Sequence, residues 1–147
     1  MKGKKAVLEA LNGLLTHELS AADQYFIHSR MYQDWGLDEL YERLKHEQEE
    51  ELDHATKLIE RILFLEGTPD VASRDKLKVG KNVPSMLQND LDYELLVQKE
   101  LTKAIDVCEG AGDYVSRQVL MGLLTDTETD HIYWLEIQLG LIEKVGL

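Results

Sequence analysis

The chain has 147 residues, a mass of 16.8 kDa and a formal net charge of −12, from 16 basic and 28 acidic residues. This length suits one domain with a buried core, and the acidic surface repels nucleic acid and anionic lipid while it attracts cations. A single cysteine, Cys108, excludes an internal disulfide framework. No apolar run is long enough to span a bilayer, and Glu9 and Asn12 interrupt the stretch that a signal peptide would need. We therefore expect a cytoplasmic protein whose partners are neither nucleic acid nor membrane.

Apolar residues recur every three or four positions on both sides of Pro69 and Pro84, which is the period of amphipathic helices. The pattern predicts four helices, over residues 5–34, 38–66, 84–109 and 113–145. Gly67 is expected to take the left-handed conformation that ends the second helix, and Asp113 is expected to cap the fourth. Residues 67–83 show no period and are predicted to form an extended connection.

The lengths of the connections predict the topology. Short links make the first and second helices antiparallel, and likewise the third and fourth. The connection 67–83 can extend by about 3.4 Å per residue, enough to cross a helix of about 28 residues. The chain is therefore predicted to be all-α, a single domain over residues 1–147, and a four-helix bundle with one long crossover between its second and third helices.

Six polar residues interrupt the apolar stripes of these helices. The first and third helices carry one glutamate each, and the second and fourth carry a Glu and a His three positions apart, a spacing that places both on one helix face: Glu18; Glu51 and His54; Glu94; Glu128 and His131. Four buried carboxylates cannot all stay ionised without a cation, and carboxylate with imidazole suits iron or manganese.

The six residues are enough for a pair of metal ions. Two ions about 3.5–4 Å apart need bridging and terminal ligands. Glu51 and Glu128 are the natural bridges, Glu18 with His54 would complete one ion, and Glu94 with His131 would complete the other, as in known di-iron carboxylate bundles. Each motif alone has a simpler interpretation, since a single Glu-x-x-His is usually a solvated pair and residues 47–51 could form an acidic surface. The joint pattern favours the metal centre.

Four stretches of the sequence resemble the bacterioferritins, and the resemblance extends over essentially every residue: DQYFIHSRMYQDWGL (23–37), IERILFLEGTP (59–69), DYVSRQVL (113–120) and HIYWLEIQLGLIEKVGL (131–147). The same six residues match the ferroxidase ligands of that family. The resemblance implies a ferritin-like fold and a hollow shell of 24 subunits. It also implies a di-iron centre that oxidises Fe²⁺ with O₂ or peroxide, storage of the ferric product inside, and a small redox protein for iron release.

Three features depart from the pattern of the family. Leu52 follows Glu51, where haem-carrying members have a methionine ligand, so haem is not expected here. The chain resembles the haem-less subunit type, which would co-assemble with a methionine-bearing partner. Segment 126–131 has one residue more than many relatives, although Glu128 and His131 keep their spacing. The sequence stops at Leu147, before the fifth helix that is usual in the family.

Further residues are expected to support the centre. Asp90 is a candidate acceptor for a ligand histidine, and the Tyr25 hydroxyl is a candidate partner for a ligand carboxylate. Tyr25 and Trp134 match aromatic residues that the family uses in electron transfer, with ordinary core packing as the alternative. His46 and Glu50 match an accessory iron site on the inner surface of the shell, with a solvated ion pair as the alternative.

Two other functions are compatible with the sequence: a di-iron peroxidase or oxygenase, and a non-catalytic structural subunit of a mixed ferritin shell. Peroxidases of the rubrerythrin type usually carry a module with paired CxxC motifs, which a single cysteine cannot build. Oxygenases usually have larger bundles. Particle mass together with metal content per subunit would separate these functions.

Overall fold

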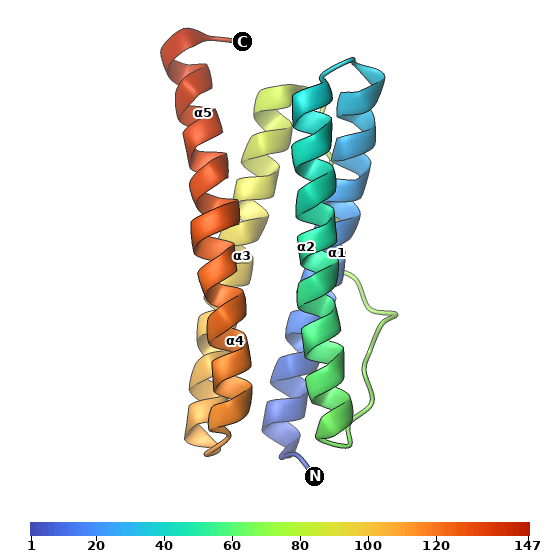
Figure 1. The fold of residues 1–147 in the computed structure, drawn as a ribbon, viewed down its shortest axis with the longest axis vertical. Coiled ribbons are helices and arrows are strands. Elements are labelled where there is room, and N and C mark those ends of the chain that lie inside the picture. Colours follow the sequence, from blue (N-terminus) through green and yellow to red (C-terminus); the bar gives the residue numbers. More distant parts are fainter.

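A computed structural model describes residues 1–147, which form a bundle of long helices (Figure 1). The first three are α1 (Lys5–Asp34), α2 (Asp38–Phe64) and α3 (Val83–Gly110), and the fourth is continuous but consists of α4 (Tyr114–Asp126), the π-helix η1 (Thr127–Ile132) and α5 (Tyr133–Val145). The segment between α2 and α3 runs along the bundle, so that these two helices point the same way (Figure 1). The predicted four-helix bundle with one long crossover is confirmed. None of the helices has the length and apolar character required to cross a membrane.

The core lies where the sequence pattern of α3 places it. The period of residues 84–109 predicts an inward stripe of seven residues on this helix, and all seven are buried: Leu87, Asp90, Glu94, Val97, Leu101, Ile105 and Cys108. Four of them, Val97, Leu101, Ile105 and Cys108, pack in one cluster with leucines of α1 and α2, including Leu11, Leu15 and Leu58. Full burial of each such side chain contributes about 1.5–3 kcal/mol. This apolar packing encloses the polar residues among it and keeps them from solvent.

On the fourth helix the sequence pattern predicts an inward face with Met121, Leu124, Glu128 and His131, but before His131 the buried face is shifted by one residue. Leu120, Leu123 and Thr127 are buried, whereas Met121 and Glu128 are exposed. The prediction assumed an α-helical period along the whole helix. The wider turn of η1 holds one residue more than an α-turn, so every position before it is displaced by one.

The ends of the helices are formed by local contacts. The side chain of Asp113 accepts from the Ser116 backbone N–H at 3.0 Å, so its predicted role as the cap of the fourth helix is confirmed. The prediction for Gly67 is wrong, because the left-handed residue after α2 is Glu66, with φ of 63°. Gly67 is needed for space instead, since a Cβ there would lie 2.6 Å from Leu8 Cδ2.

The crossover is held by a row of polar side chains on α1. Four backbone N–H groups of the crossover donate hydrogen bonds to these side chains, so that amides covered by the bundle keep a partner. The bonds run from Asp70 to Asn12 at 2.8 Å, Asp75 to Ser20 at 2.8 Å, Lys78 to Gln24 at 3.1 Å and Gly80 to His28 at 3.2 Å. The acceptors lie four or eight residues apart on one face of α1. They fix the path of the crossover along this helix.

We expect Gly80→Ala to destabilise the protein by about 1–3 kcal/mol, the usual cost of overpacking. A Cβ at this position would lie 2.6 Å from the backbone nitrogen of Met86, and backbone inside α3 cannot move aside. Gly13→Ala is the matched control, because its Cβ meets nothing within 4 Å and alanine stabilises a helix interior by about 0.5–1 kcal/mol relative to glycine. Urea unfolding of both variants measures the difference, and equal stabilities would contradict the steric argument.

Candidate metal centre

Five of the six predicted residues meet in the middle of the bundle. They form two groups of three that share Glu51: Glu18, Glu51 and His54, and Glu51, Glu94 and His131. Within each group the ligating atoms lie within 4.8 Å of one another. All five side chains are at most 1% exposed. The helices α1, α2 and α3 and the π-helix η1 each contribute at least one of them, so the fold itself assembles the cluster.

Several oxygens of this cluster have no hydrogen-bond partner. They are Oε1 of Glu18, Oε2 of Glu51 and Oε2 of Glu94. A buried polar group without a partner costs several kcal/mol, and a buried charge costs more unless an opposite charge is present. Divalent cations would remove this cost at all three atoms. The residues present therefore fit a pair of cations bound around Glu51.

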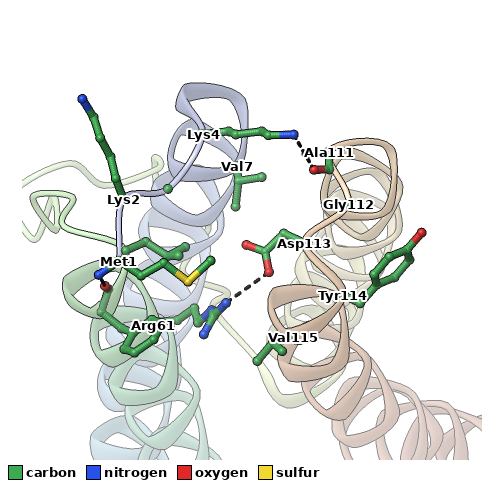
Figure 2. Close-up of a pocket in the computed structure, with 13 residues that line it drawn as sticks. Met1, Lys2, Lys4, Val7, Arg61, Ala111, Gly112, Asp113, Tyr114 and Val115 are labelled. Carbon is green, nitrogen blue, oxygen red and sulfur yellow. Dashed lines mark hydrogen bonds and ion pairs between the residues drawn. The ribbon is translucent and has the colours of Figure 1, made fainter.

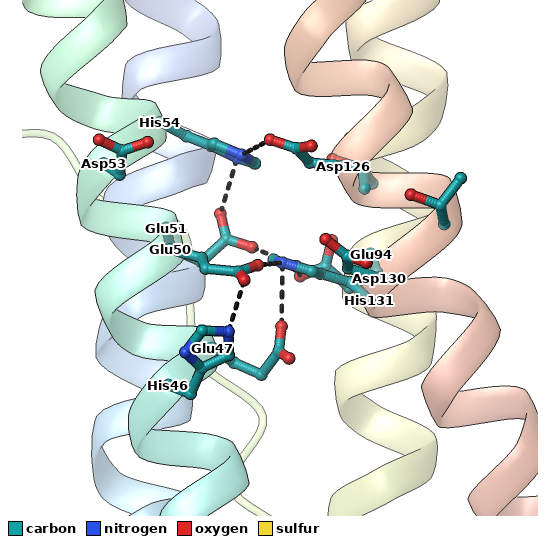
Figure 3. Close-up of polar contacts among 12 residues, drawn as sticks. His46, Glu47, Glu50, Glu51, Asp53, His54, Glu94, Asp126, Asp130 and His131 are labelled. Atoms are coloured by element: carbon teal, nitrogen blue, oxygen red, sulfur yellow. Dashed lines mark hydrogen bonds and ion pairs between the residues drawn. The ribbon is translucent and has the colours of Figure 1, made fainter.

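His54 lies between the carboxylates of Glu18 and Asp126, and Figure 3 shows its contact with Asp126. Its Nδ1 lies 3.1 Å from Glu18 Oε2, inside the cluster, and its Nε2 lies 3.0 Å from Asp126 Oδ2. Asp126 is 43% exposed and lies outside the cluster. An outer acceptor of this kind fixes the tautomer of a ligand histidine and points its other nitrogen at the metal. Asp126 was not predicted from the sequence.

His131 has the same arrangement on the other half of the centre (Figure 3). Its Nδ1 lies 2.8 Å from Glu51 Oε1, and its Nε2 lies 2.7 Å from Glu50 Oε2 and 2.9 Å from Glu47 Oε2. The rings of His54 and His131 are stacked, with centroids 5.9 Å apart. Each ring thus presents Nδ1 to the cluster and Nε2 to an outer carboxylate.

Glu47 is a buried carboxylate to which the sequence analysis gave no role. It is 1% exposed, and its Oε1 accepts from Arg43 Nε at 2.7 Å. Glu47, Glu50 and His131 form a third group with ligating atoms within 4.8 Å of one another. The signal was available, because Glu47 lies one helical turn before Glu51 on the buried face of α2.

The sixth predicted residue, Glu128, lies outside the cluster. Its side chain is exposed, and its Oε1 accepts from Gln98 Nε2 at 3.1 Å. The expectation that Glu128 and His131 share an inward face is wrong, because both lie in η1 and the three-residue spacing aligns side chains only on an α-helix.

The structure places the two expected aromatic residues differently. Tyr25 is buried, and its hydroxyl donates to Glu94 Oε1 at 2.6 Å, as predicted for a partner of a ligand carboxylate. Trp134 is half-buried, and its ring packs under the guanidinium of Arg43, which lies 4.7 Å from the ring centroid. Only Tyr25 contacts a member of the cluster directly.

Asp90 contacts neither histidine of the cluster. Its Oδ1 lies 2.9 Å from His28 Nδ1 and accepts from Gln24 Nε2 at 2.9 Å. The expectation that it orients a ligand histidine is wrong, because the next turn of α1 brings His28 against it first. Asp90 belongs to the contacts that hold the crossover.

Burial and mutual repulsion dominate the protonation of the centre. Burial raises the pKa of Glu51 well above its ordinary value, and the nearby charges of Glu18 and Glu94 raise it further. Burial opposes a charge on His131, but the surrounding carboxylates, Glu94 foremost, outweigh it and raise the pKa of the imidazole far above its usual range. Without cations, the centre therefore retains protons.

Two further expected positions lie on the outside of α2. His46 Nε2 lies 2.6 Å from Glu50 Oε1, so this pair adjoins His131 through Glu50. Leu52 is 44% exposed, and its side chain has no donor atom for a haem iron.

The largest groove on the surface is not part of this centre. It lies at the end of the bundle where the N-terminus meets the turn between α3 and α4 (Figure 2). Its one acidic residue, Asp113, is paired with Arg61 at 3.1 Å. Lys4 Nζ donates to the Ala111 carbonyl across the same gap at 2.7 Å. The groove offers no group of metal ligands.

A crossover-type four-helix bundle with carboxylate and histidine groups in its middle is the architecture of a ferritin-like protein. The family model of the ferritin-like domain matches residues 8–145. A bacterial ferritin of Synechocystis is 63% identical over the whole chain and 94% of its own length, and one of Paramagnetospirillum magnetotacticum is 58% identical over the whole chain and 90% of its own. A bacterioferritin of Brucella melitensis is 42% identical over 99% of this chain and 90% of its own. The chain belongs to the bacterioferritin family.

Proposed function

We propose that the protein stores iron and oxidises it at the buried centre, as a ferroxidase subunit. The observation that carries this proposal is the pair of buried groups joined by Glu51, with carboxylate oxygens that have no partner inside the protein. Ferritin names among the relatives support the storage role. Bound iron would supply the redox chemistry, with each of two Fe²⁺ giving one electron to O₂ or peroxide.

Glu51, Tyr25 and His131 have distinct roles in the proposed reaction. Glu51 lies between both halves of the centre and can bind on both sides. Tyr25 holds Glu94 through its hydroxyl. His131 would bind a cation through Nδ1 in place of the proton that the metal-free protein keeps there, and the apolar packing around the centre excludes bulk water. The protein thus supplies position and charge.

The same proposal includes a shell. Apolar side chains remain exposed along the bundle, among them Phe26, Phe64 and Leu141, and such residues suit contacts between subunits. We propose assembly of 24 subunits, release of stored iron through a small redox protein, and no axial haem ligand from this chain. A methionine-bearing subunit would supply that ligand in a mixed shell.

Anaerobic titration of the purified protein with Fe²⁺ is expected to saturate tight sites at about two ions per chain. The variant Glu51→Ala with His131→Ala is expected to lose these sites, since it removes the shared carboxylate and one imidazole. Glu49→Ala is the control, because Glu49 lies in the same acidic run but is exposed. On addition of O₂, the double variant should oxidise Fe²⁺ no faster than buffer does.

Oxidation by the double variant at the rate of the wild type would overturn the proposal. Native mass measured on the same sample tests the storage role separately. A particle of hundreds of kilodaltons supports it, and a dimer supports a di-iron peroxidase or oxygenase instead.

A further inference from the structure

The fourth helix contains an irregularity beside the metal centre. Residues Thr127–Ile132 form a π-helix between two α-helical segments. Well under 1% of residues adopt this conformation, and single π-turns inside α-helices arise where the chain holds one residue too many, frequently at functional sites. This turn carries His131, so it bears directly on which other residues of the helix reach the centre.

Because of the π-turn, Thr127 and not Glu128 faces the interior of the bundle. Thr127 is buried, and its hydroxyl donates to the Leu123 carbonyl at 2.9 Å. The next residue, Glu128, is exposed and bonded to Gln98. The position that points into the bundle one helical turn before His131 therefore holds a short hydroxyl side chain, which cannot bridge two cations.

The acidic residue that does act on the centre is Asp126. Its Oδ2 lies 3.0 Å from His54 Nε2, and a carboxylate can only accept, so Nε2 carries a proton that it donates to Asp126. Residues two positions apart on a helix point about 200° apart. Asp126 and Glu128 therefore cannot face the centre together, and rotation of Glu128 inward would break the contact of Asp126 with His54.

We propose that Asp126, and not Glu128, is the acidic residue through which the fourth helix acts on the centre, and that Glu51 is the one carboxylate the two cations share. This inference rests on the proposed function, since it concerns the same site. Asp126 acts as a positioning residue for His54. The centre then has five protein ligands: Glu18, Glu51, His54, Glu94 and His131.

The test uses Co²⁺ as a probe that does not turn over, titrated into the full-length metal-free protein and followed by its visible absorption. Glu128→Gln is expected to bind two Co²⁺ per chain with affinities within about twofold of the wild type, because its side chain lies outside. Asp126→Ala is expected to bind Co²⁺ about 10–100-fold more weakly, which is the usual effect of removing an outer acceptor. Asp126→Asn, which keeps an acceptor oxygen, is expected to restore part of the loss.

Deletion of Thr127 supplies a gain-of-binding test. The deletion removes the additional residue, so the helix can close as an α-helix and Glu128 moves into the inward position. Because a second shared carboxylate is added, the weaker of the two Co²⁺ sites should tighten by about tenfold or more. Circular dichroism in the presence of a chelator checks that each variant keeps its helices.

The outcomes separate this inference from the proposed function. If the wild type binds no Co²⁺, the metal centre itself is wrong. If the wild type binds two ions and Glu128→Gln binds one, with helix content unchanged, the assignment of Glu128 is overturned. Equal affinities of Asp126→Ala and the wild type would likewise overturn the role of Asp126. Should the deletion variant fail to fold, the three substitutions still decide the question.

Discussion

Addition of Co²⁺ at about 1,000 times its dissociation constant is expected to raise the unfolding temperature of the metal-free protein by about 16–32 °C when both sites are filled. Binding to the folded state alone contributes about 4 kcal/mol per site at this excess, and each kcal/mol shifts the midpoint by about 2–4 °C for a chain of this size. Much of this gain reflects the cost that the buried carboxylates impose without cations, since Oε1 of Glu18 and Oε2 of Glu94 have no hydrogen-bond partner. Differential scanning calorimetry at fixed protein concentration, with Co²⁺ or with a chelator, measures the shift.

Glu51→Gln is expected to show opposite effects under the two conditions. In chelator it should unfold at a higher temperature than the wild type, because the amide is neutral without binding a proton, whereas burial and the charges of Glu18 and Glu94 make either an ionised or a protonated Glu51 costly relative to the unfolded chain. With Co²⁺ it should gain little, because the shared ligand is lost. Glu49→Gln is the exposed control and should behave as the wild type does. A lower midpoint for Glu51→Gln in chelator would show that the buried carboxylate is not a source of instability.

The stabilisation by Co²⁺ is expected to depend on pH, because the pKa values of Glu51 and His131 are raised in the metal-free protein. The pKa of Glu51 lies above its ordinary 4.5 and that of His131 above its ordinary 6.5. The folded metal-free protein therefore binds more protons than the unfolded chain, and its stability falls as pH rises from about 5 to 8, by up to about 1.4 kcal/mol per pH unit for each group. Cations replace these protons, so the stabilisation by Co²⁺ should increase with pH.

The sequence predicted the regular parts of this protein because helical periodicity and burial agree there. The stripe on α3 was predicted without error, including Asp90 and Glu94 among its apolar residues. Link lengths were sufficient for the parallel arrangement of α2 and α3, since only the long connection can cross the bundle. The five residues that meet in the centre follow from the same periodicity, applied to α1, α2 and α3 and to the last helix from His131 onward.

The errors arise where the backbone departs from the α-helical period or where a contact is made between distant segments. One additional residue before His131 could be counted in the sequence, but its absorption as a π-turn depends on tertiary packing, so Glu128 was assigned inward. The partners of Asp90 and His54 lie on other helices, and the spacing of residues along one helix does not predict contacts between helices. The row of acceptors on α1 was not predicted, because the crossover that covers it has no periodic pattern from which its path could be inferred.

Loss of the buried contact between His28 and Asp90 is expected to be the most destabilising change outside the metal centre. The Gly80 backbone N–H donates to Nε2 of His28, so the proton of the ring lies on Nδ1, 2.9 Å from Asp90 Oδ1. Both side chains are fully buried. His28→Ala leaves the carboxylate supported by Gln24 alone and removes the acceptor of Gly80, and removal of one partner of a buried pair costs about 3–5 kcal/mol.

His17→Ala is the matched control for His28→Ala. His17 also pairs with an aspartate of the crossover, Asp75, but its side chain is partly exposed and Tyr93 donates to the same carboxylate at 2.6 Å. An exposed pair of this kind contributes about 1 kcal/mol or less. Urea unfolding of both variants in chelator, at equal protein concentration, should therefore separate them by at least about 2 kcal/mol. Similar losses of stability in the two variants would contradict this prediction. The buried contacts of His28 with Asp90 and Gly80 would then contribute no more than the partly exposed contact of His17 with Asp75.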